Sequence, residues 1–79
     1  MERFEGKLLR NKQTVLDGIA GNFTAPREGF FAAPAGTNLI TRTFCELALV
    51  DGRTLPVTIT KVVPNGHRPA MVFFASPES

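Results

Sequence analysis

The chain has 79 residues and a mass of 8.6 kDa, which suits one small domain spanning residues 1–79. Apolar residues make up 43% of it and charged residues 20%, a balance typical of a globular protein rather than a disordered one. The net charge of +2 is too small to identify an anionic partner by itself. No apolar run is long enough to cross a membrane as a helix, so no membrane association is expected.

The small size of the domain limits how much stability its own core can supply. Such a chain buries only about 60% of the surface that it exposes when unfolded. Cys45 is the single cysteine and cannot form an internal disulfide, and no ligand set for a metal or a cofactor is visible. Self-association is the remaining common source of burial. The lone cysteine and the absence of a signal-peptide pattern predict a cytoplasmic location.

Glycine and proline interrupt the chain at short intervals, and strand-forming residues fill the segments between them. This pattern predicts an all-β domain, a small antiparallel β-barrel or rolled sheet of about six short strands. A short helical turn is an alternative within residues 32–38. The expected strands, in chain order, are Arg3–Arg10, Gln13–Thr24, Glu28–Ala33, Asn38–Leu49, Arg53–Val63 and Ala70–Ser76.

The first two strands are expected to form a hairpin with a two-residue turn at residues 11–12. In this register, apolar side chains from both strands share one face. Asp17 then points toward that apolar side, unless it forms a turn with Gly18 or bonds to backbone amides. The expected pairs are Leu8 with Val15, Gly6 with Asp17 and Phe4 with Ile19.

The fourth and fifth strands are expected to join through a three-residue loop at residues 50–52. A two-residue loop would mix apolar and polar side chains on each face, whereas the longer loop separates them. The longer loop requires a left-handed conformation at Gly52, which glycine adopts without strain. The expected pairs are Leu47 with Leu55, Cys45 with Val57 and Thr43 with Ile59.

Adjacent pairs of large apolar residues occur at six places in the predicted strands. Neighbouring side chains of a strand point to opposite faces, so one member of each pair faces away from a one-sided core. An exposed apolar surface of this kind usually marks a partner site. We therefore expect a non-enzymatic binding or scaffold module that self-associates, most simply as a two-fold dimer. The candidate contact residues are Phe30, Phe31, Phe73 and Phe74.

A second hypothesis is a nucleic-acid-binding barrel. The register of the second hairpin places Phe44 on the outer face beside Arg42 and Thr58, with Lys61 further along the fifth strand. Bases stack on exposed aromatic rings, and neighbouring basic side chains contact phosphates. The chain has no tryptophan or tyrosine to extend such a platform.

A third hypothesis is an oligomeric ligand-binding protein or enzyme with a site between subunits. Its candidate residues are Asp17 and His67, the single histidine, which lies in a turn segment. A nucleophile–base pair of Cys45 and His67 is not expected, because the hairpin register directs Cys45 inward. No catalytic residue, reaction or small-molecule ligand is assigned from the sequence.

Overall fold

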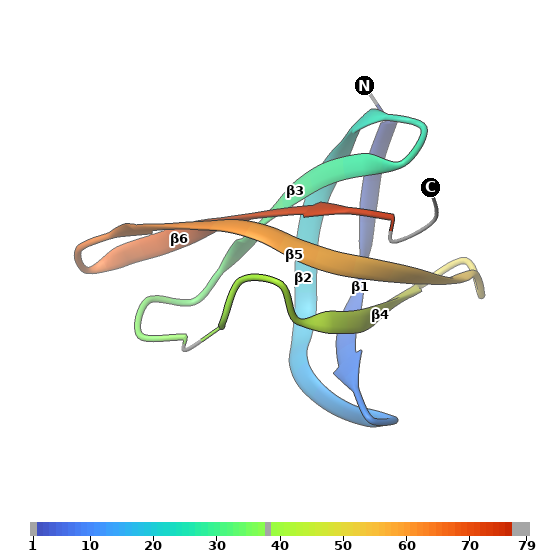
Figure 1. Ribbon diagram of the computed structural model, residues 1–79, viewed down its shortest axis with the longest axis horizontal. Coiled ribbons are helices and arrows are strands. Elements are labelled where there is room, and N and C mark those ends of the chain that lie inside the picture. Colours follow the sequence, from blue (N-terminus) through green and yellow to red (C-terminus); the bar gives the residue numbers. More distant parts are fainter. Residues whose placement is uncertain (1, 38, 77–79) are drawn as a thin grey trace.

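The computed structural model describes residues 2–37 and 39–76, which form antiparallel strands joined by short turns (Figure 1). No helix occurs in these residues, and hence none that is long and apolar enough to cross a membrane. The strands are β1 (Glu2–Arg10), β2 (Gln13–Ala25), β3 (Glu28–Ala33), β4 (Phe44–Leu49), β5 (Thr54–Asn65) and β6 (Arg68–Ala75).

The strands close into a barrel in the order β1-β2-β3-β6-β5-β4. Each strand pairs antiparallel with both of its neighbours, and the short pairing of β1 with β4 completes the closure. The structure therefore confirms the predicted all-β fold as a closed antiparallel barrel rather than an open rolled sheet. The ends of the β1–β2 and β5–β6 hairpins project from the barrel in different directions (Figure 1).

The β4–β5 hairpin has the predicted register. Cys45 lies opposite Val57, and the backbone N–H of Leu49 donates to the carbonyl oxygen of Arg53 at 2.7 Å, which closes a three-residue loop. Gly52 adopts a φ of +99°, the left-handed conformation that this loop requires. The remaining predicted pairs are also present, Leu47 with Leu55 and Thr43 with Ile59.

The β1–β2 hairpin has the predicted turn but a different register. Residues 11–12 have φ values of 52° and 65°, as a type I′ turn requires. Beyond the turn, two bulges each add one residue to β2. Asp17 therefore lies exposed and does not face the apolar side, so that prediction was wrong. The alternative is confirmed, because Asp17 bonds to the backbone amide of Gly18. The observed pairs are Leu8 with Leu16, Gly6 with Ile19 and Phe4 with Gly21.

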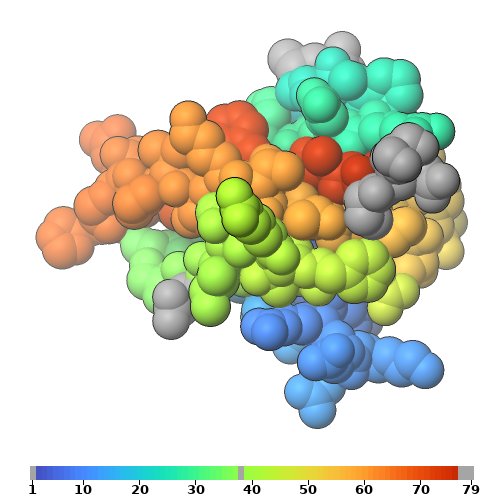
Figure 2. Space-filling view, viewed as in Figure 1, coloured from blue at the N-terminus to red at the C-terminus, as the bar shows by residue number. Residues whose placement is uncertain are grey.

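The fourth strand is shorter than predicted. Asn38, where the prediction began, lies outside the described residues, and β4 starts at Phe44. Residues 39–43 form a loop in which Arg42 has a φ of 65°. The helical alternative was wrong for residues 32–37, where Thr37 donates its N–H to the carbonyl oxygen of Pro34 in a simple turn. Residues 39–43 lie on the front of the molecule, between the two projecting hairpins (Figure 2).

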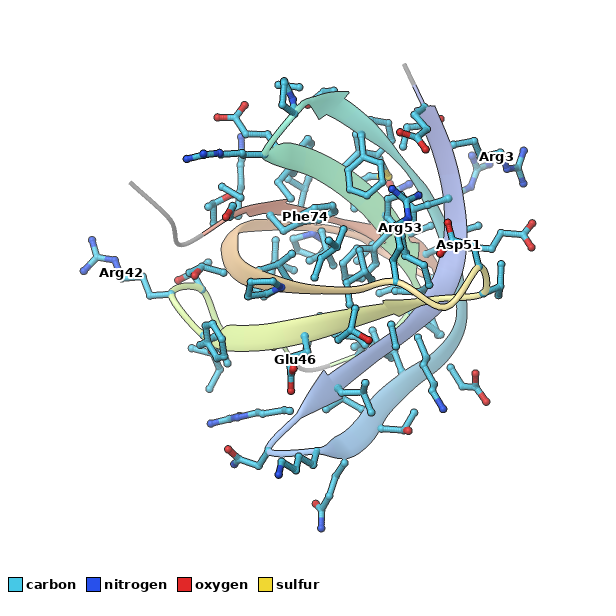
Figure 3. The ribbon with its side chains drawn as sticks, turned by 90° about the vertical axis from the view of Figure 1, so that its right-hand side faces the viewer. Arg3, Arg42, Glu46, Asp51, Arg53 and Phe74 are labelled. Atoms are coloured by element: carbon cyan, nitrogen blue, oxygen red, sulfur yellow. The ribbon has the colours of Figure 1, made fainter. Side chains whose placement is uncertain are left out.

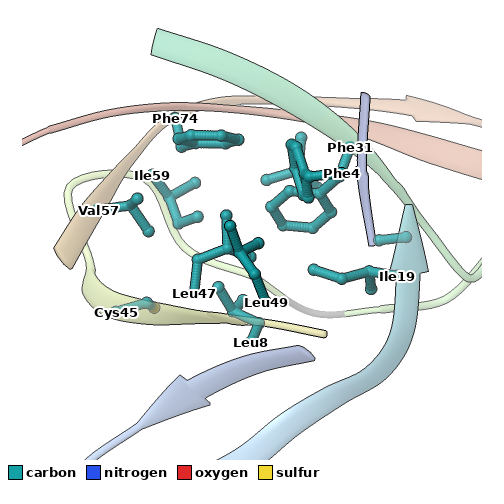
Figure 4. Close-up of a cluster of buried hydrophobic side chains, with 12 residues drawn as sticks. Phe4, Leu8, Ile19, Phe31, Cys45, Leu47, Leu49, Val57, Ile59 and Phe74 are labelled. Carbon is teal, nitrogen blue, oxygen red and sulfur yellow. The ribbon is translucent and has the colours of Figure 1, made fainter. Parts of the chain in front are cut away.

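The core fills the interior of the barrel with aliphatic and aromatic side chains from all six strands (Figure 4). Phenylalanine rings contact one another there, with centroids 4.8 Å apart for Phe4 and Phe23 and 6.0 Å apart for Phe31 and Phe74. No polar or charged residue is buried within residues 2–37 and 39–76. The interior is therefore a dry apolar core, and binding groups have to be sought on the outside.

Candidate interaction surfaces

The structure decides which member of each phenylalanine doublet faces outward. Phe31 and Phe74 are 0% and 3% exposed and belong to the core. Phe30 and Phe73 are half-buried on the outer face, where they lie opposite each other on β3 and β6. The prediction of four contact residues therefore needs correction, because the buried rings of Phe31 and Phe74 cannot reach a partner. Phe30 and Phe73 are available for one.

The two outward rings lie at one end of an apolar surface. Their centroids are 5.9 Å apart with an interplanar angle of 45°. The next pairs along the same strands place Ala32, Met71 and Val63 on the same face. An open depression runs from Phe30, Ala32 and Met71 toward β1 and β2. We call this surface the Phe30–Phe73 face and define it by Phe30, Ala32, Val63, Met71 and Phe73.

Three charged residues border the Phe30–Phe73 face. Arg3 lines its depression and pairs with Glu5 at 3.9 Å, and Lys61 and Glu28 lie on two other sides. Lys61 on β5 lies directly opposite Phe73, and Glu28 on β3 precedes Phe30 by two residues and so shares its face. Both side chains are exposed. Neither forms an ion pair with another residue in the described part of the chain. The face therefore carries one unpaired cation and one unpaired anion at its rim.

The second predicted surface is also present on the outside of the barrel. Phe44 is 56% exposed at the start of β4, opposite Thr58 on β5. Arg42 is held close by its backbone N–H, which donates to the carbonyl oxygen of Ile59 at 2.6 Å, and its side chain points away from the barrel (Figure 3). The structure thus places Phe44 opposite Thr58 and the backbone of Arg42 beside Ile59, with Lys61 further along β5 opposite Phe73.

Charged side chains form a network near the loop between β4 and β5. Arg53 donates from Nε to Oδ2 of Asp51 at 2.8 Å and forms a second ion pair with Glu2 at 3.3 Å. The backbone N–H of Arg53 lowers the pKa of Asp51 by donating to Oδ1 at 3.0 Å, and the side-chain bond lowers it further. The bond to Asp51 raises the pKa of Arg53 in turn. This network lies on the opposite side of the barrel from Arg42 and supports the loop (Figure 3).

The structure does not bring Asp17 and His67 together. Asp17 lies in the bulged part of β2, where it accepts the N–H of Gly18 at 2.8 Å and borders an open depression with Glu5 and Lys7. His67 lies at the turn between β5 and β6, and neither of those strands pairs with β2. A site within one chain that uses both residues is therefore not supported.

Cys45 is buried, as its register predicted. Its exposed fraction is 2%, and burial raises the pKa of its thiol, partly offset by the nearby charge of Arg10. A thiol of this kind stays protonated near neutral pH and is a poor nucleophile. In the described residues, no group of three or more histidine, cysteine, aspartate or glutamate side chains is placed to hold a metal ion. The outer surfaces are therefore the candidate sites.

Comparison with known proteins adds no family. Neither protein-family models, nor curated proteins, nor solved structures gave a match to this chain. The class that the fold defines is a small closed antiparallel barrel of six strands. Its function has to be inferred from its own surfaces, because a barrel of this kind serves many functions.

Some members of these surfaces were not singled out from the sequence. Met71, Ala32 and Val63 complete the Phe30–Phe73 face because they lie in register with its rings. The alternation of side chains along β3 and β6 indicates which residues share a face. To place them beside the rings, however, the pairing of two strands that are far apart in the sequence must be known. Ile40, from one of the six apolar pairs, is 64% exposed, but it lies in a loop before β4 and not in the strand that was expected there.

Proposed function

We propose that this protein is a non-enzymatic binding module that self-associates through the Phe30–Phe73 face. The observation that carries the proposal is the outward pair of contacting phenylalanine rings, beside the Ala32–Met71 pair of the same two strands. Aromatic side chains contribute most to typical protein interfaces. The rings already contact each other in the single chain, so little ordering is needed when a partner binds.

The total exposed surface supports a second copy as the partner. The chain exposes 5268 Å², whereas a monomer of its mass typically exposes about 4,700 Å². A dimer would thus supply the burial that a domain of this size lacks.

The free strand edge supports contact through a face rather than by strand addition. Beyond Thr58, β5 continues to Asn65 with β6 as its partner, because β4 begins at Phe44. A bulge at Thr60 and the missing N–H of Pro64 interrupt the hydrogen-bonding groups of this edge. Natural sheets use the same features to prevent edge-to-edge pairing. The lone buried cysteine fits the reducing cytoplasm in which we place the module.

Replacement of Phe73 by serine tests the proposal. We expect Phe73→Ser to weaken the dimer about thirtyfold, because each dimer loses two partly buried rings, together about 2 kcal/mol. Sedimentation velocity over a concentration series gives the dissociation constant, and circular dichroism checks the fold. Val50→Ser is the matched control, since Val50 is 78% exposed in the loop between β4 and β5. Equal dissociation constants for wild type and Phe73→Ser would contradict the proposal.

A second candidate function is the binding of single-stranded nucleic acid at Phe44. The exposure of this ring beside Arg42, which forms no ion pair in the described residues, favours it. Stacking of one base on an aromatic ring is worth about 1–3 kcal/mol, so Phe44→Ala should weaken binding of a fluorescent oligothymidine at least about fivefold. Binding should also decrease with salt, with a logarithmic slope near −1.4 for two phosphate contacts, at about −0.7 each.

The control for this experiment is Arg27→Ala, which changes a basic residue in the turn between β2 and β3. Fluorescence anisotropy at low salt measures the binding of the oligothymidine to the wild type and to both variants. Absence of binding, or binding that Phe44→Ala leaves unchanged, would exclude the nucleic-acid function and leave self-association as the function of the barrel.

A further inference from the structure

We propose that the dimer is a two-fold assembly in which Lys61 of each copy pairs with Glu28 of the other. This inference rests on the proposed self-association through the Phe30–Phe73 face and adds its orientation. It starts from the two unpaired charges at the rim of that face, one on β5 and one on β3.

The register fixes where these charges lie relative to the two rings. Phe30, Phe73 and Lys61 form one row across β3, β6 and β5. With strands about 4.8 Å apart, Lys61 is about 7 Å from the midpoint between the two rings. Glu28 lies two residues before Phe30 on β3, on the same face, which also places it about 7 Å from that midpoint. The two charges are therefore equally distant from the midpoint.

Equal distances matter because of how a two-fold axis acts on a flat interface. Consider a two-fold axis that lies in the interface and passes through the midpoint of the rings. If two positions are equally far from this midpoint and the axis bisects the angle between them, each position lies over the other position of the partner copy. Such an axis places Lys61 over the partner's Glu28 and, by the same operation, Glu28 over the partner's Lys61. Two ion pairs form at once, on either side of the rings.

Within one chain, the same two residues do not pair. Glu28 lies on β3 and Lys61 on β5, with β6 between them, and Glu28 is two residues away from the row that contains Lys61. Their Cα atoms are therefore about 12 Å apart. Across packed sheets the backbones are about 10 Å apart, a gap that a lysine and a glutamate side chain reaching toward each other can span. The strands of the two copies then cross at about 70°, nearer to orthogonal than to aligned sheet packing.

A charge reversal at both positions tests the pairing. Lys61→Glu and Glu28→Lys should each weaken the dimer about five- to thirtyfold, because each creates two like-charge contacts at the rim. The double variant Lys61→Glu/Glu28→Lys should return to within about threefold of the wild type, since both pairs re-form with opposite polarity. Both residues are exposed, so the variants should keep the fold, which circular dichroism checks.

The outcomes separate this inference from the proposal on which it rests. Sedimentation velocity of the four proteins, with Phe73→Ser alongside, measures the dissociation constants. If the double variant is as weak as or weaker than the single variants while Phe73→Ser still dissociates the dimer, the face is right and the pairing is wrong. If Phe73→Ser has no effect, or if the wild type is monomeric, the proposed function fails and the pairing fails with it.

Discussion

Gly6→Ala is expected to unfold the barrel or to lower its melting temperature by more than about 12 °C. A Cβ atom at Gly6 would collide with the backbone carbonyl oxygen of Ala48, in the short β1–β4 pairing that closes the barrel. Because backbone cannot move aside as a flexible side chain can, we expect a loss of about 3 kcal/mol, at the upper end for overpacked sites. A domain of this size loses about 4–8 °C for each kcal/mol.

Gly18→Ala is the control for this variant. A Cβ atom at Gly18 would meet no atom within 4 Å, although its φ of +65° disfavours alanine. We expect it to cost about 1 kcal/mol, through backbone conformation alone. Thermal denaturation followed by circular dichroism compares the two. A melting temperature for Gly6→Ala within a few degrees of the wild type would show that β1 and β4 do not approach as closely as described.

Phe31→Ala is expected to have the second large effect, a loss of about 3–5 kcal/mol in the free energy of unfolding. The Phe31 side chain is fully buried, and its ring lies 6.0 Å from that of Phe74. Removal of the ring leaves a cavity that the surrounding strands cannot fill without disrupting their pairing. Since small domains have about 5–15 kcal/mol in total, this variant loses a large share of its stability, and its melting temperature should fall by at least about 12 °C.

The neighbouring residue provides a matched control. Phe30→Ala removes the same ring from the other face of β3, where it is half-buried and contacts Phe73. At concentrations too low for dimer formation, we expect a loss of less than about 1.5 kcal/mol in urea denaturation. Equal losses for Phe30→Ala and Phe31→Ala would contradict the assignment of one ring to the core and the other to the surface.

The two hairpins show how far sequence patterns predict a barrel. The β4–β5 hairpin was predicted correctly because only one loop length separated its apolar and polar side chains. In the β1–β2 hairpin, the turn was right, but the bulges that shift Val15 and Asp17 outward were not foreseen. A bulge adds a residue without changing the local composition, so a regular alternation of side chains does not reveal it.

The surfaces were predicted only in part, because the outward position of a side chain depends on the register of its strand. The outward position of Phe44 followed from a register that the sequence determines. For Phe30 and Phe31, the sequence showed that one ring faces outward, but not which one. That choice depends on how β3 pairs with β2 and β6, and β6 is distant in the chain. The loop before β4 was missed because Leu39 and Ile40 look like strand residues, although glycine and proline precede them.

The mass of the wild-type protein in solution tests the central claim most directly. Sedimentation equilibrium from about 1 µM to about 1 mM covers the range in which a dimer of modest affinity forms. The account predicts an average mass that rises with concentration from 8.6 kDa toward twice that value. A mass that stays at 8.6 kDa across the whole range would mean that the Phe30–Phe73 face does not bind a second copy.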